Sequence, residues 1–118
     1  MKIVISPAKS LNFEKPIPTK QYTEPAFLKQ AATIQKTLKK QKPKQMSELM
    51  SISDKLAELN WQRNQDWNIP FTPDNARPAI YTFDGDVYTG LDAYTLPADK
   101  IDALQSKLRI LSGLYGLL

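Results

Sequence analysis

A cluster of hydroxyl and lysine side chains follows the first apolar run of the chain. Ile3-Val4-Ile5 is a short β-branched run typical of a buried strand, and Ser6-Pro7-Ala8-Lys9-Ser10 comes directly after it. A lysine with hydroxyls and free amides at the carboxyl end of a strand can hold a phosphate, so Ser6, Lys9 and Ser10 are candidate phosphate-binding residues. The segment lacks the glycines of a Walker loop. A proline-fixed turn with an exposed lysine explains it equally well.

A second cluster, Asp84-Gly85-Asp86, places two carboxylates on a tight turn that could hold Mg²⁺ through oxygen ligands. Aspartate and glycine are also common turn formers, and an ordinary turn is the favoured interpretation. Asp86 is the only metal-ligand candidate, and no metal and no cofactor are predicted. The chain has no histidine and no cysteine, which excludes a zinc hydrolase, a Ser-His-Asp enzyme and thiol chemistry from these residues alone.

Positive charge is concentrated in the first part of the chain. Residues 1–45 carry ten lysines and only Glu14 and Glu24, whereas residues 46–118 carry more acidic than basic side chains. Lys29, Lys36 and Lys40 fall at i, i+7 and i+11, which predicts a basic face on one helix. Such a face suits contacts to DNA phosphates. A lysine-rich solvated surface is the alternative.

Apolar spacing and prolines predict the elements that position these residues. A helix is expected to begin near Thr23 and to end before Pro43. Its apolar stripe consists of Phe27, Leu28, Ala31, Ile34 and Leu38. A short helical piece is predicted over residues 46–50, and Ser53 is the expected cap of a longer helix that runs toward Trp67. The expected buried face of this longer helix consists of Ile52, Leu56 and Leu59.

The last third of the chain predicts a second strand and a final helix. Ala79 to Phe83 is the strand candidate, and residues 87–93 suit a helical turn. A final helix is expected from Pro97, with a stripe of Ile101, Leu104, Leu108 and Leu111. The predicted fold class is therefore α/β (mixed α+β), with helices and a few short strands. Because two strands do not make a stable sheet, part of the fold is expected to be missing from residues 1–118.

Four blocks in order resemble the YaaA family, and the resemblance covers residues 1–118. The blocks are residues 5–11 (ISPAKSL), 49–57 (LMSISDKLA), 75–77 (NAR) with 85–91 (GDVYTGL), and 108–116 (LRILSGLYG). Members of that family are about twice this length. In them the Gly-Leu-Tyr-Gly segment continues into further sequence. The resemblance therefore implies that residues 1–118 are the N-terminal part of one larger domain whose C-terminal half is absent, so a truncated chain is expected here.

The resemblance implies a cytoplasmic peroxide-stress protein that limits unincorporated iron and oxidative DNA damage. It also implies a basic cleft and a helix-hairpin-helix-like element that bind double-stranded or bubble DNA. Within this sequence the expected DNA contacts are Lys9, Lys29, Lys36, Lys40, Lys107, Arg109, Gly113 and Gly116. In that hypothesis Gly113 to Gly116 follow a helix and approach a phosphate, and a glycine helix cap is the alternative.

Two further functions remain open from the residues. The first is an enzyme that acts on a phosphorylated or nucleotide ligand at Ser6 to Lys9, with Asp86 as metal ligand or base, although no catalytic mechanism accompanies the resemblance. The second is an iron-sequestering protein, which the carboxylate-only ligand set disfavours. The N-terminal apolar run is too short for a signal peptide or a membrane span, so no membrane partner is predicted.

Overall fold

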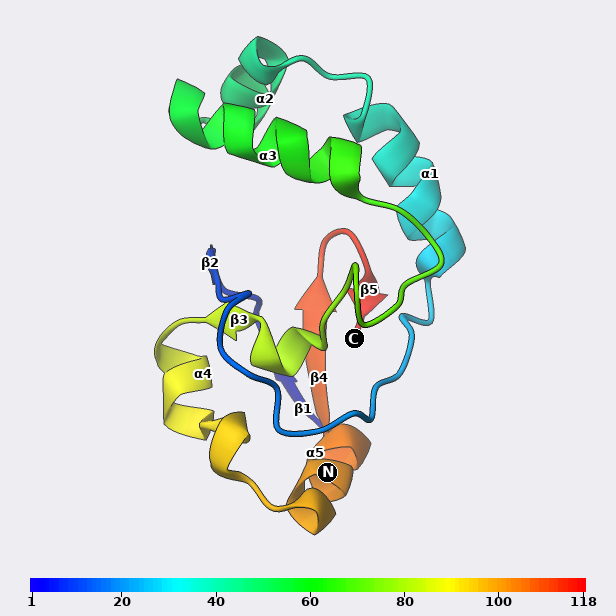
Figure 1. The fold of residues 1–118 in the computed structure, drawn as a ribbon, viewed down its shortest axis with the longest axis vertical. Coiled ribbons are helices and arrows are strands. Elements are labelled where there is room, and N and C mark those ends of the chain that lie inside the picture. Colours follow the sequence, from blue (N-terminus) through cyan, green and yellow to red (C-terminus); the bar gives the residue numbers. More distant parts are fainter.

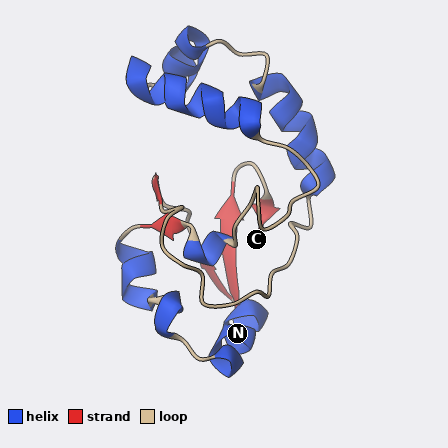
Figure 2. Ribbon diagram, in the orientation of Figure 1, coloured by secondary structure: helices blue, strands red, loops and turns tan.

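The chain contains five α-helices and five short strands, which confirms the mixed α/β class. The computed structural model describes residues 1–118. In chain order the strands and helices are β1 (Ile3–Ile5), β2 (Ser10–Leu11), α1 (Leu28–Leu38), α2 (Pro43–Met50), α3 (Asp54–Asp66), the 3-10 helix η1 (Ala79–Tyr81), β3 (Phe83–Asp84), α4 (Asp86–Leu91), the 3-10 helix η2 (Ala93–Thr95), α5 (Ala98–Lys107), β4 (Leu108–Ser112) and β5 (Gly116–Leu117). Helices α1, α2 and α3 form one end of the molecule, here called the helical part (Figure 1). All strands lie in the remainder, the sheet part (Figure 2).

The sheet part contains a three-stranded and a two-stranded sheet. Strand β4 lies between β1 and β5, parallel to β1 and antiparallel to β5. The register pairs Ile3 with Leu108 and Ile5 with Ile110. Strands β2 and β3 form a separate antiparallel pair. Because β1 and β4 are parallel, the loop after β1 and the hairpin after β4 lie at the same edge of the sheet.

The helical part follows the local signals of the sequence closely. Pro43 occupies the first turn of α2, where its missing amide is not needed. The Ser53 hydroxyl accepts a hydrogen bond from the Leu56 amide and caps α3, as predicted. Helices α2 and α3 pack against each other, and α1 contacts α3 through the Gln35–Asn64 hydrogen bond (Figure 1). None of the helices has the length and apolar character needed to cross a membrane.

Each part has its own small core. Fully buried side chains of the helical part are Ala31, Gln35, Met46 and Ala57, and those of the sheet part are Tyr81, Tyr88, Ala93 and Ile110. The radius of gyration is 15.2 Å, against about 13.5 Å for a compact domain of this length. The molecule is therefore elongated, and few contacts join its two parts.

Two predicted elements in the last third were wrong. Residues 79–81 form a 3-10 turn, and only Phe83 and Asp84 are extended. The turn is held by Arg77, whose guanidinium donates to the Tyr81 carbonyl oxygen. The final helix ends at Lys107, and the expected helical positions 108 and 111 belong to β4 instead. Pairing with β1, far away in the sequence, overrides the helical spacing.

The predicted boundaries and buried faces also need correction. Helix α1 begins at Leu28 instead of near Thr23, and no side chain caps it. On α3 it is Ala57 that is buried, whereas Leu56 and Leu59 are 48% and 44% exposed. Strand β1 is present, but Val4 is 57% exposed, so it is not the buried strand that its apolar run predicts. The β-branched residues therefore predict that a strand forms here, but they do not predict whether it is buried.

Candidate functional site

The loop after β1 lies against the turn that precedes α4. Ser10 pairs with Asp84 in the β2–β3 ladder. A Cβ added at Gly85 would lie 3.2 Å from the Ala8 Cβ, so glycine permits this close approach. The Tyr88 hydroxyl donates to the Ser6 carbonyl oxygen at 2.7 Å. The structure thus brings together the two clusters that the sequence presented separately, residues 6–10 and residues 84–86.

Side chains of these two segments, here called the strand-end cluster, are mostly exposed. Ser6, Lys9, Ser10 and Asp86 all face solvent, and Lys9 forms no ion pair. Burial raises the pKa of the Tyr88 hydroxyl, which therefore stays a neutral donor at neutral pH. A lysine, hydroxyls and carboxylates on one surface can hydrogen-bond an ionic ligand. No group of three potential metal-ligating side chains forms in the structure, so Asp86 belongs to no such group.

Arg77 joins the segment after β2 to the wall of the sheet part. Its Nη2 atom donates to the carbonyl oxygens of Lys15 at 2.7 Å and Tyr81 at 3.1 Å, and to the Tyr94 hydroxyl at 3.0 Å. Burial, together with the neighbouring Tyr94, raises the pKa of Tyr81. Sequence reasoning assigned no role to these side chains. The only signal was the position of Arg77 in the Asn75-Ala76-Arg77 block.

The segment Gly113 to Gly116 connects two strands and does not follow a helix. It is the turn of the β4–β5 hairpin, so the expected helix-hairpin-helix-like arrangement and the alternative of a glycine helix cap are both wrong for these residues. The Tyr115 hydroxyl accepts a hydrogen bond from the Trp67 indole at 2.8 Å. Gly116 has a φ of +70° and lies against the Phe27 ring. The hairpin therefore contacts the segments that flank the helical part.

The lysines of the first 45 residues are largely free of carboxylate partners. Lys29 and Lys36 are exposed on α1, and Lys40 is exposed just beyond its end. Lys39 differs, because its ammonium donates to the Trp67 carbonyl oxygen at 2.6 Å. The single ion pair in the structure joins Lys100 to Asp99 at 3.7 Å. Positive charge on α1 and the α1–α2 corner is therefore not neutralised within the chain.

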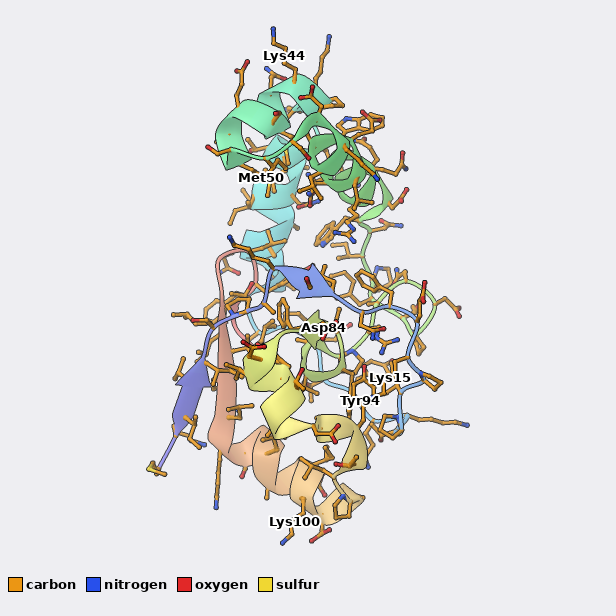
Figure 3. The ribbon with its side chains drawn as sticks, turned by 90° about the vertical axis from the view of Figure 1, so that its left-hand side faces the viewer. Lys15, Lys44, Met50, Asp84, Tyr94 and Lys100 are labelled. Carbon is orange, nitrogen blue, oxygen red and sulfur yellow. The ribbon has the colours of Figure 1, made fainter.

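The other predicted DNA contacts do not lie on that face. Lys107 and Arg109 lie where β4 begins, beside α5, at the end of the molecule away from α1 to α3 (Figure 1). The Arg109 guanidinium donates to the Gln105 and Leu108 carbonyl oxygens. Lys44 and Lys100 mark the two ends of the long axis in Figure 3. The predicted contacts therefore divide into a helical face, a hairpin, a distant basic pair and Lys9 in the strand-end cluster.

Comparison with known proteins gives a consistent result. Residues 1–118 match a family model described as peroxide stress protein YaaA. The chain is similar to UPF0246 proteins of Flavobacterium johnsoniae (76% identity), Flavobacterium psychrophilum (63%) and Hahella chejuensis (57%). Each match covers 100% of this chain, and 47%, 47% and 46% of the respective relative. The chain thus spans about half the length of the curated relatives it matches.

Proposed function

The chain belongs to the peroxide stress protein YaaA family, and from that premise we propose that it protects the cell by binding DNA. The protein would act in the cytoplasm, limit intracellular free iron and so limit oxidative damage to DNA. Its DNA partner would be double-stranded or contain a bubble. The lysines of α1 and the α1–α2 corner would supply the contacts.

The observation that carries this proposal is the unneutralised positive face. Lys29 and Lys36 lie seven residues apart on α1 and so share a face, and Lys40 follows the end of the helix. None of the three has a carboxylate within 4.0 Å. Lysines without internal partners are available to displace counterions from DNA phosphates, which supplies sequence-independent affinity.

The same chemistry favours DNA over iron as the partner of these residues. A tight iron site needs several histidine, cysteine or carboxylate ligands converging on one point. The chain has no histidine or cysteine, and no group of three such ligands forms. We therefore assign the protective effect of this chain to DNA and not to iron held by its own side chains.

Fluorescence anisotropy with labelled duplex and bubble DNA tests the proposal. The triple substitution Lys29→Gln, Lys36→Gln and Lys40→Gln should weaken binding. It should also make the plot of log affinity against log salt shallower by up to about 2.7, at about 0.9 per lost duplex phosphate contact. Lys100→Gln is the matched control, since Lys100 is paired with Asp99 at the other end of the molecule.

Two results would refute the proposal. Absence of DNA binding at low salt excludes it directly. If Lys100→Gln lost about one third of the logarithmic affinity that the triple variant loses, the same loss per lysine would show that net charge, and not the helical face, determines binding. Circular dichroism of each variant verifies that substitution at these exposed positions leaves the helices intact.

The strand-end cluster favours a second candidate, an enzyme or binding protein for a phosphorylated ligand. Its supporting observation is the adjacency of the Ser6–Ser10 loop and the Asp84–Asp86 turn, fixed by the Tyr88 hydrogen bond. In this hypothesis Lys9 would hold the phosphate, and Asp86 would assist as base.

Thermal melting with a nucleotide and Mg²⁺ tests this second candidate. At a ligand concentration about 100-fold above Kd, the stabilisation should be about 2.7 kcal/mol and should disappear in Lys9→Met. Lys20→Met, at another exposed lysine, is the control. An unchanged melting temperature at saturating nucleotide would exclude the ligand, and an equal response of both variants would exclude Lys9.

A further inference from the structure

A cavity of about 230 Å³ lies on the sheet part, away from the lysine face and beside the strand-end cluster. The segment after β2, the 3-10 helix η1, strand β3 and the segment from α4 to η2 line this open cavity, and neither Lys9 nor Asp86 lines it. Five of its ten lining residues are hydrophobic. Since drug-sized ligands occupy about 300–1,000 Å³, the cavity suits a smaller molecule.

The cavity carries charges of both signs that do not neutralise each other. Lys15, Asp84 and Asp92 all line it, yet no ion pair within 4.0 Å joins Lys15 to either carboxylate. The Asp84 carboxylate accepts no hydrogen bond from the chain. One oxygen of Asp92 accepts from the Thr95 hydroxyl at 3.2 Å, which leaves its other oxygen free. A cation and two carboxylates therefore remain available to a ligand.

Lys15 is held apart from the carboxylates by contacts on its backbone and its side chain. Its amide donates to the Asn12 side-chain oxygen at 3.0 Å, and its carbonyl accepts from Arg77 at 2.7 Å. The ammonium lies 4.1 Å from the centroid of the Tyr94 ring, an attractive cation–π arrangement. Figure 3 shows Lys15 and Tyr94 side by side, with Asp84 nearby.

The Tyr94 ring is itself fixed. Its hydroxyl donates to the Tyr81 carbonyl oxygen at 2.5 Å and accepts from the Arg77 guanidinium at 3.0 Å. Arg77 thus positions both the ring and the lysine that lies over it. The Tyr94 ring and the Lys15 backbone are held in place by the fold before any ligand arrives, which reduces the ordering cost of binding.

We propose that this cavity binds a small zwitterion, an α-amino acid or a close analogue. The ammonium of the ligand pairs with Asp84 and Asp92, and its carboxylate pairs with Lys15 and the Asn12 side-chain amide. The apolar half of the lining receives an aliphatic side chain. Lys15, Asp84 and Asp92 are the binding residues, and Arg77 and Tyr94 are positioning residues.

Other ligand classes fit these charges less well. A phosphate would meet two carboxylates beside one lysine. A divalent cation would meet the Lys15 ammonium and find only two carboxylates, fewer than the several oxygen ligands that it requires. A simple amine would leave Lys15 without a partner. Only a ligand that carries both charges satisfies all three side chains.

Titration of the protein with leucine, followed by amide chemical shifts in NMR spectra, tests the proposal. Ion pairs at the mouth of an exposed cavity are weak, so we expect a Kd on the order of millimolar. N-acetylleucine lacks the cation and leucinamide lacks the anion. Each should bind at least about tenfold more weakly than leucine, a factor that corresponds to about 1.4 kcal/mol.

Two substitutions test which side chain binds the ammonium of the ligand and which binds its carboxylate. In Asp92→Asn the preference for leucine over N-acetylleucine should shrink, and in Lys15→Met the preference over leucinamide should shrink. Lys20→Met, an exposed lysine outside the cavity, should leave both preferences unchanged. The analogue series needs no substitution, so it decides the matter even if a variant does not fold.

Several outcomes would overturn the proposal. They are equal binding of leucine and either analogue, equal binding of a simple amine such as isobutylamine, and no shift at high leucine concentration. None of them affects the DNA hypothesis, because Lys29, Lys36 and Lys40 do not line this cavity. Conversely, failure of DNA binding leaves the zwitterion site untouched.

Discussion

Two glycines of the same hairpin turn should respond in opposite ways to alanine. Gly116→Ala is expected to destabilise the protein by about 0.5–3 kcal/mol, whereas Gly113→Ala should leave stability unchanged or raise it by up to about 1 kcal/mol. Gly116 has a φ of +70°, and a Cβ there would lie 2.8 Å from Phe27 Cδ2. At Gly113 no atom lies within 4 Å of an added Cβ, and φ is outside the left-handed region.

The magnitude for Gly116 follows from three contributions. A non-glycine residue in the left-handed region costs about 1–2 kcal/mol. The Phe27 ring is 45% exposed, so it can move outward at the cost of an off-rotamer torsion, about 0.5–1.5 kcal/mol. Against these, alanine reduces the entropy of the unfolded chain and returns about 0.4–1 kcal/mol. The net result is destabilising throughout that range.

Urea and thermal unfolding followed by circular dichroism measure the difference. For a chain of this length, 1 kcal/mol corresponds to about 4 °C, so Gly116→Ala should lower Tm by roughly 2–12 °C. In a Phe27→Ala background the steric part disappears, and the cost of Gly116→Ala should fall by about 0.5–1.5 kcal/mol. Equal losses in Gly113→Ala and Gly116→Ala would refute the reasoning about φ. Zero coupling with Phe27→Ala would refute the steric contact.

Two further predictions concern buried polar groups. Burial raises the pKa of Tyr115 and the Trp67 hydrogen bond lowers it, so Trp67→Phe should raise that pKa further, measured by tyrosinate absorbance in an alkaline titration. The stability that the neutral tyrosine contributes is complete below about pH 10 and is lost as pH rises through the folded-state pKa. Tyr115→Phe should therefore make the free energy of unfolding fall less steeply with pH above that range. An unchanged slope of the free energy of unfolding against pH would contradict this. Gln35 is 1% exposed and donates to Asn64 Oδ1 at 2.9 Å, so Gln35→Leu, which strands the Asn64 oxygen, should cost about 1–3 kcal/mol in urea unfolding. Adding Asn64→Leu should restore part of that loss, and equal destabilisation in the single and double variants would count against a stranded acceptor.

Elements whose signals are local were predictable from the sequence. Ser53 was the expected cap of α3 and occupies that position, because a hydroxyl cap acts within one turn of the helix. Pro43 was expected only to end the preceding helix, and it also begins α2, where its missing amide is not needed. The hydroxyl-and-lysine loop after the first strand was predictable for the same reason. These features depend on neighbours within a few residues.

Elements that depend on distant partners were not predictable in this way. Leu108 and Leu111 continue a helical spacing, but pairing of β4 with β1 makes them part of a strand. Pairing of Ser10 with Asp84 likewise joins two segments that are far apart in the chain. Apolar periodicity in a single sequence does not record which segment will become a sheet partner. The sequence therefore predicted residues 6–10 and 84–86 as two separate clusters, and only the β2–β3 pairing shows that they form one site.

The cavity was hidden from sequence reasoning for a different reason. Lys15 stands among lysines that look alike in sequence, and what distinguishes it is the Tyr94 ring beneath its ammonium. That ring is positioned by Arg77, which lies in a loop with no periodic pattern. Several hydrogen bonds from one loop arginine produce no regular spacing of residues that could be recognised in the sequence.

The separation of the lysine face from the cavity limits how each can influence the other. The helical part meets the sheet part through specific contacts, such as the Trp67–Tyr115 hydrogen bond and the Phe27–Gly116 packing. Coupling between two sites requires a change in such contacts that both ligands sense, and it acts equally in both directions. Phosphate contacts along α1 need no rearrangement of the β4–β5 hairpin, because the lysines are already exposed and unpaired. Likewise, the walls of the cavity are fixed by Arg77 within the sheet part. We therefore expect DNA and a zwitterion to bind independently, so that neither ligand changes the affinity for the other.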